Sequence, residues 1–316
     1  MAVNTIENRT LFMEACDQQL IEGATSGWME ANAGQVKYAG GDNVKIPTLS
    51  TTGLGNYDRN AGFPKGGVSV KYQTKTMTQD RGTSFLLDRI EVDESGFIAT
   101  AASAAAIFQR EHVIPEVDAY RYSRIYQLAN AKGYTKEYTP AASTIFSELQ
   151  KDITAVRDSG AGSADLVIIM PYPVADIFDN SDKLIKHINV GKFNQGGVDM
   201  EVKTFNGIPI IRVPSDRMKT LYDFMSGETE FGFAPADGAV QINWIICPRS
   251  VPIAVSKTDG VYIYDPETTQ GADAWKVEYR KFHDIWIKDE QLKTVRVCVE
   301  PAPKKTETGG TGDEQK

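Results

Sequence analysis

Hydrophobic and polar positions alternate along residues 68–77, and this pattern predicts a half-buried β-strand. Valine, tyrosine and threonine fall on one face of that strand, and serine, lysine and glutamine fall on the other. Residues 53–67 are rich in glycine, asparagine and proline, which is typical of a turn-rich tip. Further strands are expected over 44–49, where Pro47 indicates a strand edge or end, and over 85–92. Because an isolated hairpin is marginally stable in water, a ribbon with so little apolar material is expected to rest on a surface outside its own domain.

A long helix is predicted after the ribbon, beginning at the capping and acidic residues 93–95. One face of this helix is defined at helical spacing by Phe97, Ala101, Ala105, Phe108 and His112. Pro115 is expected to kink or restart the helix because it lacks a backbone donor, and Gly133 is expected to end it. His112 is interpreted as a packed core or interface histidine rather than a metal ligand.

The second half of the chain has the pattern of a mixed α+β domain. A helix is predicted over 139–160, a central buried strand over 165–170, a helix over 171–187 and a flexible loop over 191–197. The clearest hairpin signal is the Asn206-Gly207 pair, which separates a strand over 200–205 from one over 208–213. The later strands are expected over 240–247 and 251–256, followed by a long final hairpin of 275–287 with 292–300.

The two ends of the chain have weaker patterns. A short amphipathic helix is possible over 11–21, within a loosely organised arm that covers residues 1–45. Residues 304–316 contain no large apolar side chain, so a disordered tail is predicted. The first ten residues do not have the pattern of a signal peptide, and no apolar run reaches the ~18 residues of a membrane span. A cytoplasmic protein without a membrane partner is therefore expected.

Charge makes the ribbon stand out from the rest of the chain. The net charge is −8 and the sequence pI is about 5.1, which does not favour an autonomous nucleic-acid binder. The segment from 57 to 89 is nevertheless basic. It contains Arg59, Lys65, Lys71, Lys75, Arg81 and Arg89 against Asp58, Asp80 and Asp88. Two explanations of this basic segment are equally favoured: it docks on an acidic surface of a neighbouring molecule, or it is an ordinary charged face in contact with solvent. The candidate contact residues are Arg59, Lys65, Lys71, Lys75 and Arg81.

The search for chemistry yields no catalytic, cofactor or metal site. Cys16, Cys247 and Cys298 have neither zinc nor disulfide spacing and are interpreted as free thiols in a reducing compartment. The glycines at 160–163 lie between a helix and a strand, the wrong order for a dinucleotide loop. The acidic loop 259–273 is interpreted as solvated rather than as a calcium site. The tyrosines of 120–126 are assigned to helix packing rather than to base stacking.

The ordered set of segments resembles the major capsid protein of tailed bacteriophages, which has the Hong Kong 97-type fold. The stretch SFLLDRIEVDES followed by FIATAASAAAIFQREHVIPEVDAYRYSRIY is similar to the return strand of the extended loop and the spine helix. The stretches DLVIIMPYPVADIFDNSDKLIKHI and VKTFNGIPIIRVPSDRM resemble the axial domain. INWIICPRSVPIAVSKTDGVYIYDPETTQGADAWKVEYRKFHDIWI resembles the late segment that returns to the peripheral domain. No single motif is a strict signature; the specificity lies in their order.

This resemblance implies an α+β Hong Kong 97-type fold. Its expected segments are an N-terminal arm (1–45), an extended β-hairpin loop with flanking strands (46–92), the spine helix of a peripheral domain (93–138), an axial domain (139–255), a return to the peripheral domain with a long β-hairpin (256–300) and a disordered tail (301–316). It further implies self-assembly of pentamers and hexamers into an icosahedral virion shell around double-stranded DNA. The shell would be assembled in the bacterial host cytoplasm, with a portal and a separate scaffolding protein. Cofactors are not expected.

Two alternatives stay open at this point. An encapsulin-like compartment shares the fold and encloses cargo enzymes instead of DNA, and the sequence barely separates the two. An α/β enzyme with an unrecognised site is the third reading, and it predicts a small oligomer with a deep polar pocket.

Overall fold

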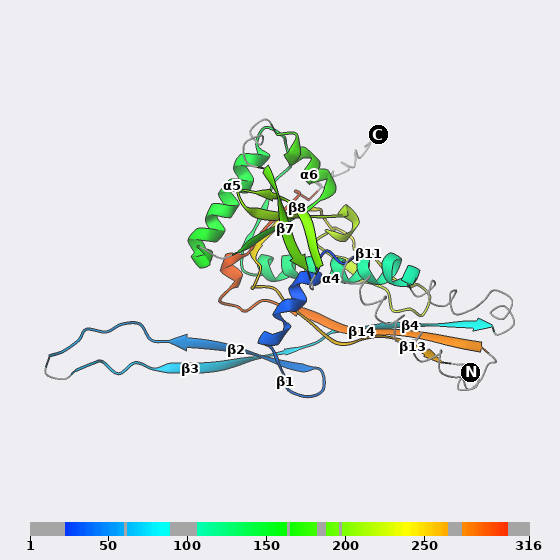
Figure 1. The fold of residues 1–316 in the computed structure, drawn as a ribbon, viewed down its shortest axis with the longest axis horizontal. Coiled ribbons are helices and arrows are strands. Elements are labelled where there is room, and N and C mark those ends of the chain that lie inside the picture. Colours follow the sequence, from blue (N-terminus) through cyan, green and yellow to red (C-terminus); the bar gives the residue numbers. More distant parts are fainter. Residues whose placement is uncertain are drawn as a thin grey trace, which may run out of the picture.

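The computed structural model describes residues 23–59, 62–88, 106–162, 165–181, 188–195, 198–264 and 274–302. Three predictions lie outside these residues: the helix over 11–21, the helix start at 93–95 and the tail over 304–316. The described segments form a layered body from which one long hairpin projects, as Figure 1 shows.

A seven-stranded mixed sheet forms the centre of the body, with the order β5-β15-β12-β6-β9-β8-β7. Its strands are β5 (Thr135–Glu137), β6 (Leu166–Pro171), β7 (Ile188–Gln195), β8 (Val198–Phe205), β9 (Ile208–Val213), β12 (Ile242–Pro248) and β15 (Arg296–Val299). β6 runs parallel to β9 and antiparallel to β12. The central position of β6 confirms the buried strand that its uninterrupted apolar run predicts, because every one of its residues is buried.

Helices cover both faces of this sheet (Figure 1). The helices are α4 (Ile114–Asn130), α5 (Ile145–Val156) and α6 (Tyr172–Asp179). Alternate residues of β6 separate the two cores. Val167 and Ile169 pack with α4 and the 3-10 helix η1 (Gly27–Gln35), whereas Ile168 packs with α5 and α6.

The described part of the predicted spine helix covers residues 106–130, and α4 is its longest regular stretch. A π-helical turn, η2 (Gln109–Val113), precedes α4, and Pro115 lies in the first turn of α4, where a missing backbone donor costs least. Gly133 has a φ of +73° just beyond the end of the helix, as predicted for a stop. His112 is exposed within the subunit and contacts the ring of Phe108.

A second, three-stranded sheet has the order β13-β14-β4. Its strands are β4 (Gln79–Asp88), β13 (Ile253–Tyr264) and β14 (Ala274–Trp286). The predicted final hairpin of 275–287 with 292–300 is therefore wrong. β14 pairs with β13 and β4, whereas β15 joins the seven-stranded sheet between β5 and β12. A 3-10 turn, η5 (Leu292–Thr294), separates the two strands.

Two further differences concern the axial segment. The predicted flexible loop over 191–197 is wrong for its first part, because β7 extends through Gln195 and pairs with β8 along its full length. The helix predicted over 171–187 ends at Asp179. The Asn206-Gly207 hairpin is confirmed. Both of its turn residues have positive φ, 50° and 79°, as a type I′ turn requires.

Two small sheets complete the structure. The hairpin sheet contains β1 (Lys37–Tyr38), β2 (Asn43–Thr51) and β3 (Val68–Thr76). A short ribbon is made by β10 (Tyr222–Phe224) and β11 (Phe233–Pro235), next to the 3-10 turn η4 (Ser215–Arg217).

Candidate assembly site

The projecting hairpin consists of β2 and β3, which pair from Asn43↔Thr76 to Thr51↔Val68. Only its base belongs to the body. Val44 and Ile46 are fully buried and pack with the sheet that contains β13 and β14. Beyond Ile46 the hairpin contributes no residue to a described hydrophobic core, and Figure 1 shows it extending well past the body.

The two faces of the hairpin differ in chemistry. Residues directly opposite each other in an antiparallel pair share a face. One face carries Leu49 opposite Val70 and Pro47 opposite Tyr72, and the leucine, valine and tyrosine of these pairs are exposed. The other face carries Thr48 opposite Lys71, and Ser50 opposite Ser69 with their hydroxyl groups 2.7 Å apart. The first of these, here named the apolar face, is an exposed apolar strip on the outer part of the strand pair.

The tip, residues 52–67, also exposes large side chains. The rings of Tyr57 and Phe63 lie 5.0 Å apart, and the side chain of Phe63 is 86% exposed. Leu54 is fully exposed. Asp58 and Gly62 hold the tip together by exchanging backbone hydrogen bonds. Exposed apolar side chains that gather on one element are typical of interaction sites.

The structure divides the five predicted contact residues. Arg59, Lys65 and Lys71 are exposed on the hairpin, and Lys75 is half-buried near its base. Arg81 lies on β4, outside the hairpin, and forms a bidentate ion pair with Glu116 of α4 at 2.6 and 3.2 Å. This ion pair engages the guanidinium inside its own subunit, and a contact of Arg81 with a neighbour stays a prediction. Local sequence contains no signal for this pairing, because Arg81 and Glu116 lie 35 positions apart in the chain.

Arg81 also contacts a surface that the sequence pattern does not predict as an interaction site. Its guanidinium donates to the carbonyl oxygen of Met225 at 2.5 Å and to that of Gly232 at 2.9 Å. These two residues delimit the connection between β10 and β11. We name residues 221–237 the acidic ribbon, because this segment contains four acidic residues and no basic one. The acidic side chains are Asp223, Glu228, Glu230 and Asp237, and all four are exposed.

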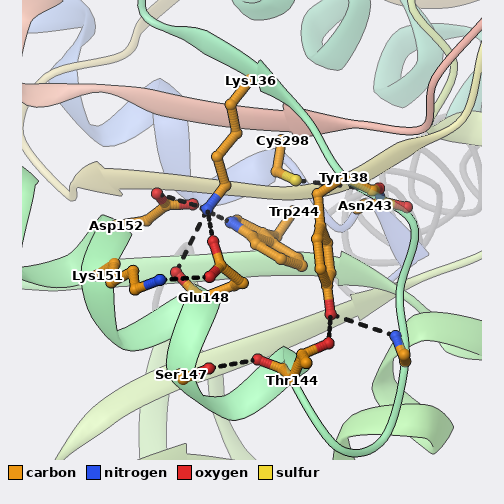
Figure 2. A network of polar contacts seen from close by, with 11 residues as sticks. Lys136, Tyr138, Thr144, Ser147, Glu148, Lys151, Asp152, Asn243, Trp244 and Cys298 are labelled. Carbon is orange, nitrogen blue, oxygen red and sulfur yellow. Dashed lines mark hydrogen bonds and ion pairs between the residues drawn. The ribbon is translucent and has the colours of Figure 1, made fainter.

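A cluster of titratable groups lies elsewhere, between α5 and the β5 edge of the large sheet (Figure 2). Lys136 pairs with Asp152 at 2.8 Å and with Glu148 at 3.3 Å, and its ammonium lies 5.3 Å from the ring centre of Trp244. The indole of Trp244 donates to Asp152 at 2.8 Å. Burial alone would lower the pKa of Lys136, but the hydrogen bond and charge of Asp152 outweigh it and raise the pKa. A lysine that keeps its proton is no nucleophile, so this cluster fastens α5 to the sheet.

Two cysteines and one histidine among the described residues are also held in inactive states. Burial raises the pKa of the Cys247 thiol, and that of Cys298, to about 12, so both free thiols stay protonated. Burial, together with the charges of Arg121, Lys281 and Arg81, holds the pKa of His283 well below its ordinary range. Tyr120 and Tyr122 are buried against the sheet, as predicted for helix packing.

No cluster of three or more histidine, cysteine or carboxylate side chains in the described ranges could hold a metal ion. Within the same ranges, none of the helices is both long and apolar enough to cross a membrane.

Comparison with known proteins rests on structure. No protein-family model matches the sequence, and a search of curated proteins finds no significant relative. The structure is similar to the asymmetric unit of the bacteriophage PhiM1 mature capsid, with a TM-score of 0.52, 14% identity and 82% of each chain covered. It is similar to the capsid structure of cyanophage P-SCSP1u, with a TM-score of 0.52, 8% identity, and 84% of this chain and 86% of that chain covered.

A third similar structure comes from an archaeon. It is the virus-like particle from Pyrococcus furiosus, with a TM-score of 0.51, 11% identity, and 92% of this chain and 98% of that chain covered. These matches run over most of each chain and confirm the predicted fold class. The chain has the α+β fold of the Hong Kong 97 type, the fold of phage capsid shells.

Proposed function

We propose that this protein is a major capsid protein, a structural subunit that assembles with copies of itself into a closed icosahedral shell. One observation carries the proposal: the hairpin exposes an apolar face and an aromatic tip that its own subunit leaves uncovered. A neighbouring copy that covers this face would bury it without any additional protein. The likeness of fold to two phage capsid structures and a virus-like particle supports the same conclusion.

In this proposal the hairpin is the extended loop and α4 is part of the spine helix. In the shell the copies are expected to form pentamers and hexamers, built through contacts between unlike surfaces of adjacent copies. Arg59, Lys65, Lys71 and Lys75 would add charge contacts to the apolar ones. The shell would enclose the double-stranded DNA of a tailed phage, with a portal and a separate scaffolding protein as partners. The role is structural and involves no catalysis.

Removal of the hairpin tip together with its last strand pair, Thr51 and Val68, tests the proposal; the shortened protein is named the hairpin-deleted chain. Thr51 to Val68 are deleted, and Ser50 is joined to Ser69 by Asn-Gly, a pair that suits a two-residue hairpin turn. This deletion keeps the strand pairing at the base of the hairpin, where Val44 and Ile46 are buried. The chain should therefore fold with nearly unchanged circular dichroism and thermal midpoint. The expected result is loss of shells in electron micrographs and a slowly sedimenting, unassembled chain.

A matched pair of substitutions locates the effect on the hairpin. Val70→Asp places a charge on the apolar face, and Ser69→Asp places the same charge on the adjacent residue of the opposite face. Assembly should fail for Val70→Asp and persist for Ser69→Asp, because only the first puts an unpaired charge into a covered apolar contact. Normal shells from the hairpin deletion would contradict the proposed function.

A closed compartment that encloses protein cargo is the second candidate, and the likeness to the Pyrococcus furiosus virus-like particle favours it. The contents of particles isolated from the native source distinguish the two. Nuclease-protected double-stranded DNA supports the phage capsid. A co-purifying protein cargo without DNA supports the compartment.

A further inference from the structure

We infer that the acidic ribbon of one copy receives the hairpin tip of a neighbouring copy. The inference rests on the proposed function and adds the surface on which the hairpin lies. Charge provides the first argument. Residues 43–76 contain five basic residues and one acidic residue, whereas residues 221–237 contain four acidic residues and no basic one. Opposite charges of this size attract and orient two surfaces before they touch.

Both surfaces also expose aromatic or apolar side chains among their charges. At the hairpin tip these are Tyr57 and Phe63, and in the acidic ribbon they are Phe231, which is 73% exposed, and Leu221. Glu230 directly precedes Phe231, and Asp58 and Arg59 are the two residues that follow Tyr57. Aromatic rings are enriched at the centre of interfaces, where they supply buried area, and the polar rim around them contributes specificity.

The acidic ribbon is held in one conformation before any contact is made. Arg81 fixes both ends of the β10–β11 connection through Met225 and Gly232, and its other contacts anchor it to Glu116 on α4. The rings of Phe224 and Phe233 stack at 6.4 Å, and the ring of Tyr120 on α4 lies 5.7 Å from that of Phe224. A surface fixed in this way loses little conformational freedom on binding.

The hairpin cannot reach this ribbon within its own chain. Figure 1 shows the tip far to the left of the body, whereas β11 lies beside α4 on the other side. The hairpin tip (the donor surface) and the acidic ribbon (the acceptor surface) are therefore different surfaces of one chain. Their contact joins successive copies head to tail. In this arrangement Arg81 holds the surface that the neighbour contacts.

Charge reversal and its rescue test the contact. The tip-reversed chain carries Arg59→Glu with Lys65→Glu, and the ribbon-reversed chain carries Glu228→Lys with Glu230→Lys. The control carries Asp289→Lys with Glu290→Lys, two exposed residues on another turn. All affected side chains are exposed, so folding should be unchanged, and circular dichroism checks this. The yield of sedimenting shells is the measurement.

Each reversed chain should lose at least about 10-fold in shell yield, and the chain with both reversals should recover to within about 2-fold of wild type. The control should assemble as wild type does. Normal assembly of the ribbon-reversed chain, or no recovery in the doubly reversed chain, would overturn this inference alone. A wild-type chain that forms no shells, or a hairpin-deleted chain that does, contradicts the proposed function instead.

Discussion

Among single residues, His283 has the clearest consequence for stability. It lies on β14 in the interior, with its ring perpendicular to that of Tyr120 and the two ring centroids 5.4 Å apart. Burial, and then the charges of Arg121, Lys281 and Arg81, oppose its protonation. The folded protein therefore keeps the imidazole neutral below the ordinary pKa of 6.5, whereas the unfolded chain binds a proton there. Because the unfolded state then holds more protons, acid destabilises the fold.

We predict that the free energy of unfolding falls as the pH drops below 6.5, by up to about 1.4 kcal/mol per pH unit from this residue. His283→Gln should remove that part of the slope between pH 6.5 and 5. Urea unfolding of the hairpin-deleted chain, which does not assemble, measures the difference. Parallel pH profiles of the two proteins would show that His283 does not titrate in this way.

At the scale of elements, the pairing of β4 with β14 depends on one close approach. Gly82 lies opposite Arg280, and a Cβ atom at position 82 would come within 2.7 Å of the carbonyl oxygen of Tyr279. A backbone atom cannot move aside as a flexible side chain can, so the strands would have to separate. This matters for the site because β4 also carries Arg81, which holds the acidic ribbon.

Gly82→Ala is therefore expected to destabilise the protein by about 1–3 kcal/mol, the usual cost of overpacking. Ser84→Ala, two residues along the same strand at an exposed position, is the matched control and should have little effect. The urea midpoint of the hairpin-deleted chain is the measurement. A midpoint unchanged by Gly82→Ala would show that the two strands have room to adjust.

Elements were predictable from sequence where local pattern decides the structure. The buried strand β6 and the Asn206-Gly207 hairpin follow from an apolar run and from turn chemistry. The sequence pattern does not predict the strand β7, because Gly191 is typical of a loop. In the structure this glycine gives room for Thr204 of β8, whose Cγ2 would lie 2.6 Å from a Cβ at position 191. Local sequence does not contain that neighbour.

The candidate site was predictable only in part, for the same reason. The alternation of apolar and polar residues predicts the strands of the hairpin, and the excess of basic residues indicates its exposed lysines. The pairing of Arg81 with Glu116, the apolar face made by opposite strands, and the acidic ribbon all depend on which distant segments meet. The final strands illustrate this too: each was recognisable, but nothing in either one decides that β14 pairs with β13 and β15 with β12.

At the scale of the whole molecule, a contact between unlike surfaces makes each subunit both donor and acceptor. The hairpin-deleted chain loses the donor but keeps the acidic ribbon. Mixed with wild type during assembly, it should accept a neighbour's hairpin and offer none in return. We predict that a 1:1 mixture gives far fewer than half the closed shells of wild type alone, measured by sedimentation and electron microscopy. A yield of one half would mean that the deleted chains are simply left out.

The hairpin beyond Ile46 has a consequence for evolution, because it takes no part in the described cores. Selection for folding hardly acts on it, whereas at Val44 and Ile46 mutation is restrained by the protein's own stability. Its sequence should therefore drift at a pace set by another surface, the one it meets on the next copy. Among descendants of this gene, a change of charge at the hairpin tip should be followed by a compensating change in the acidic ribbon.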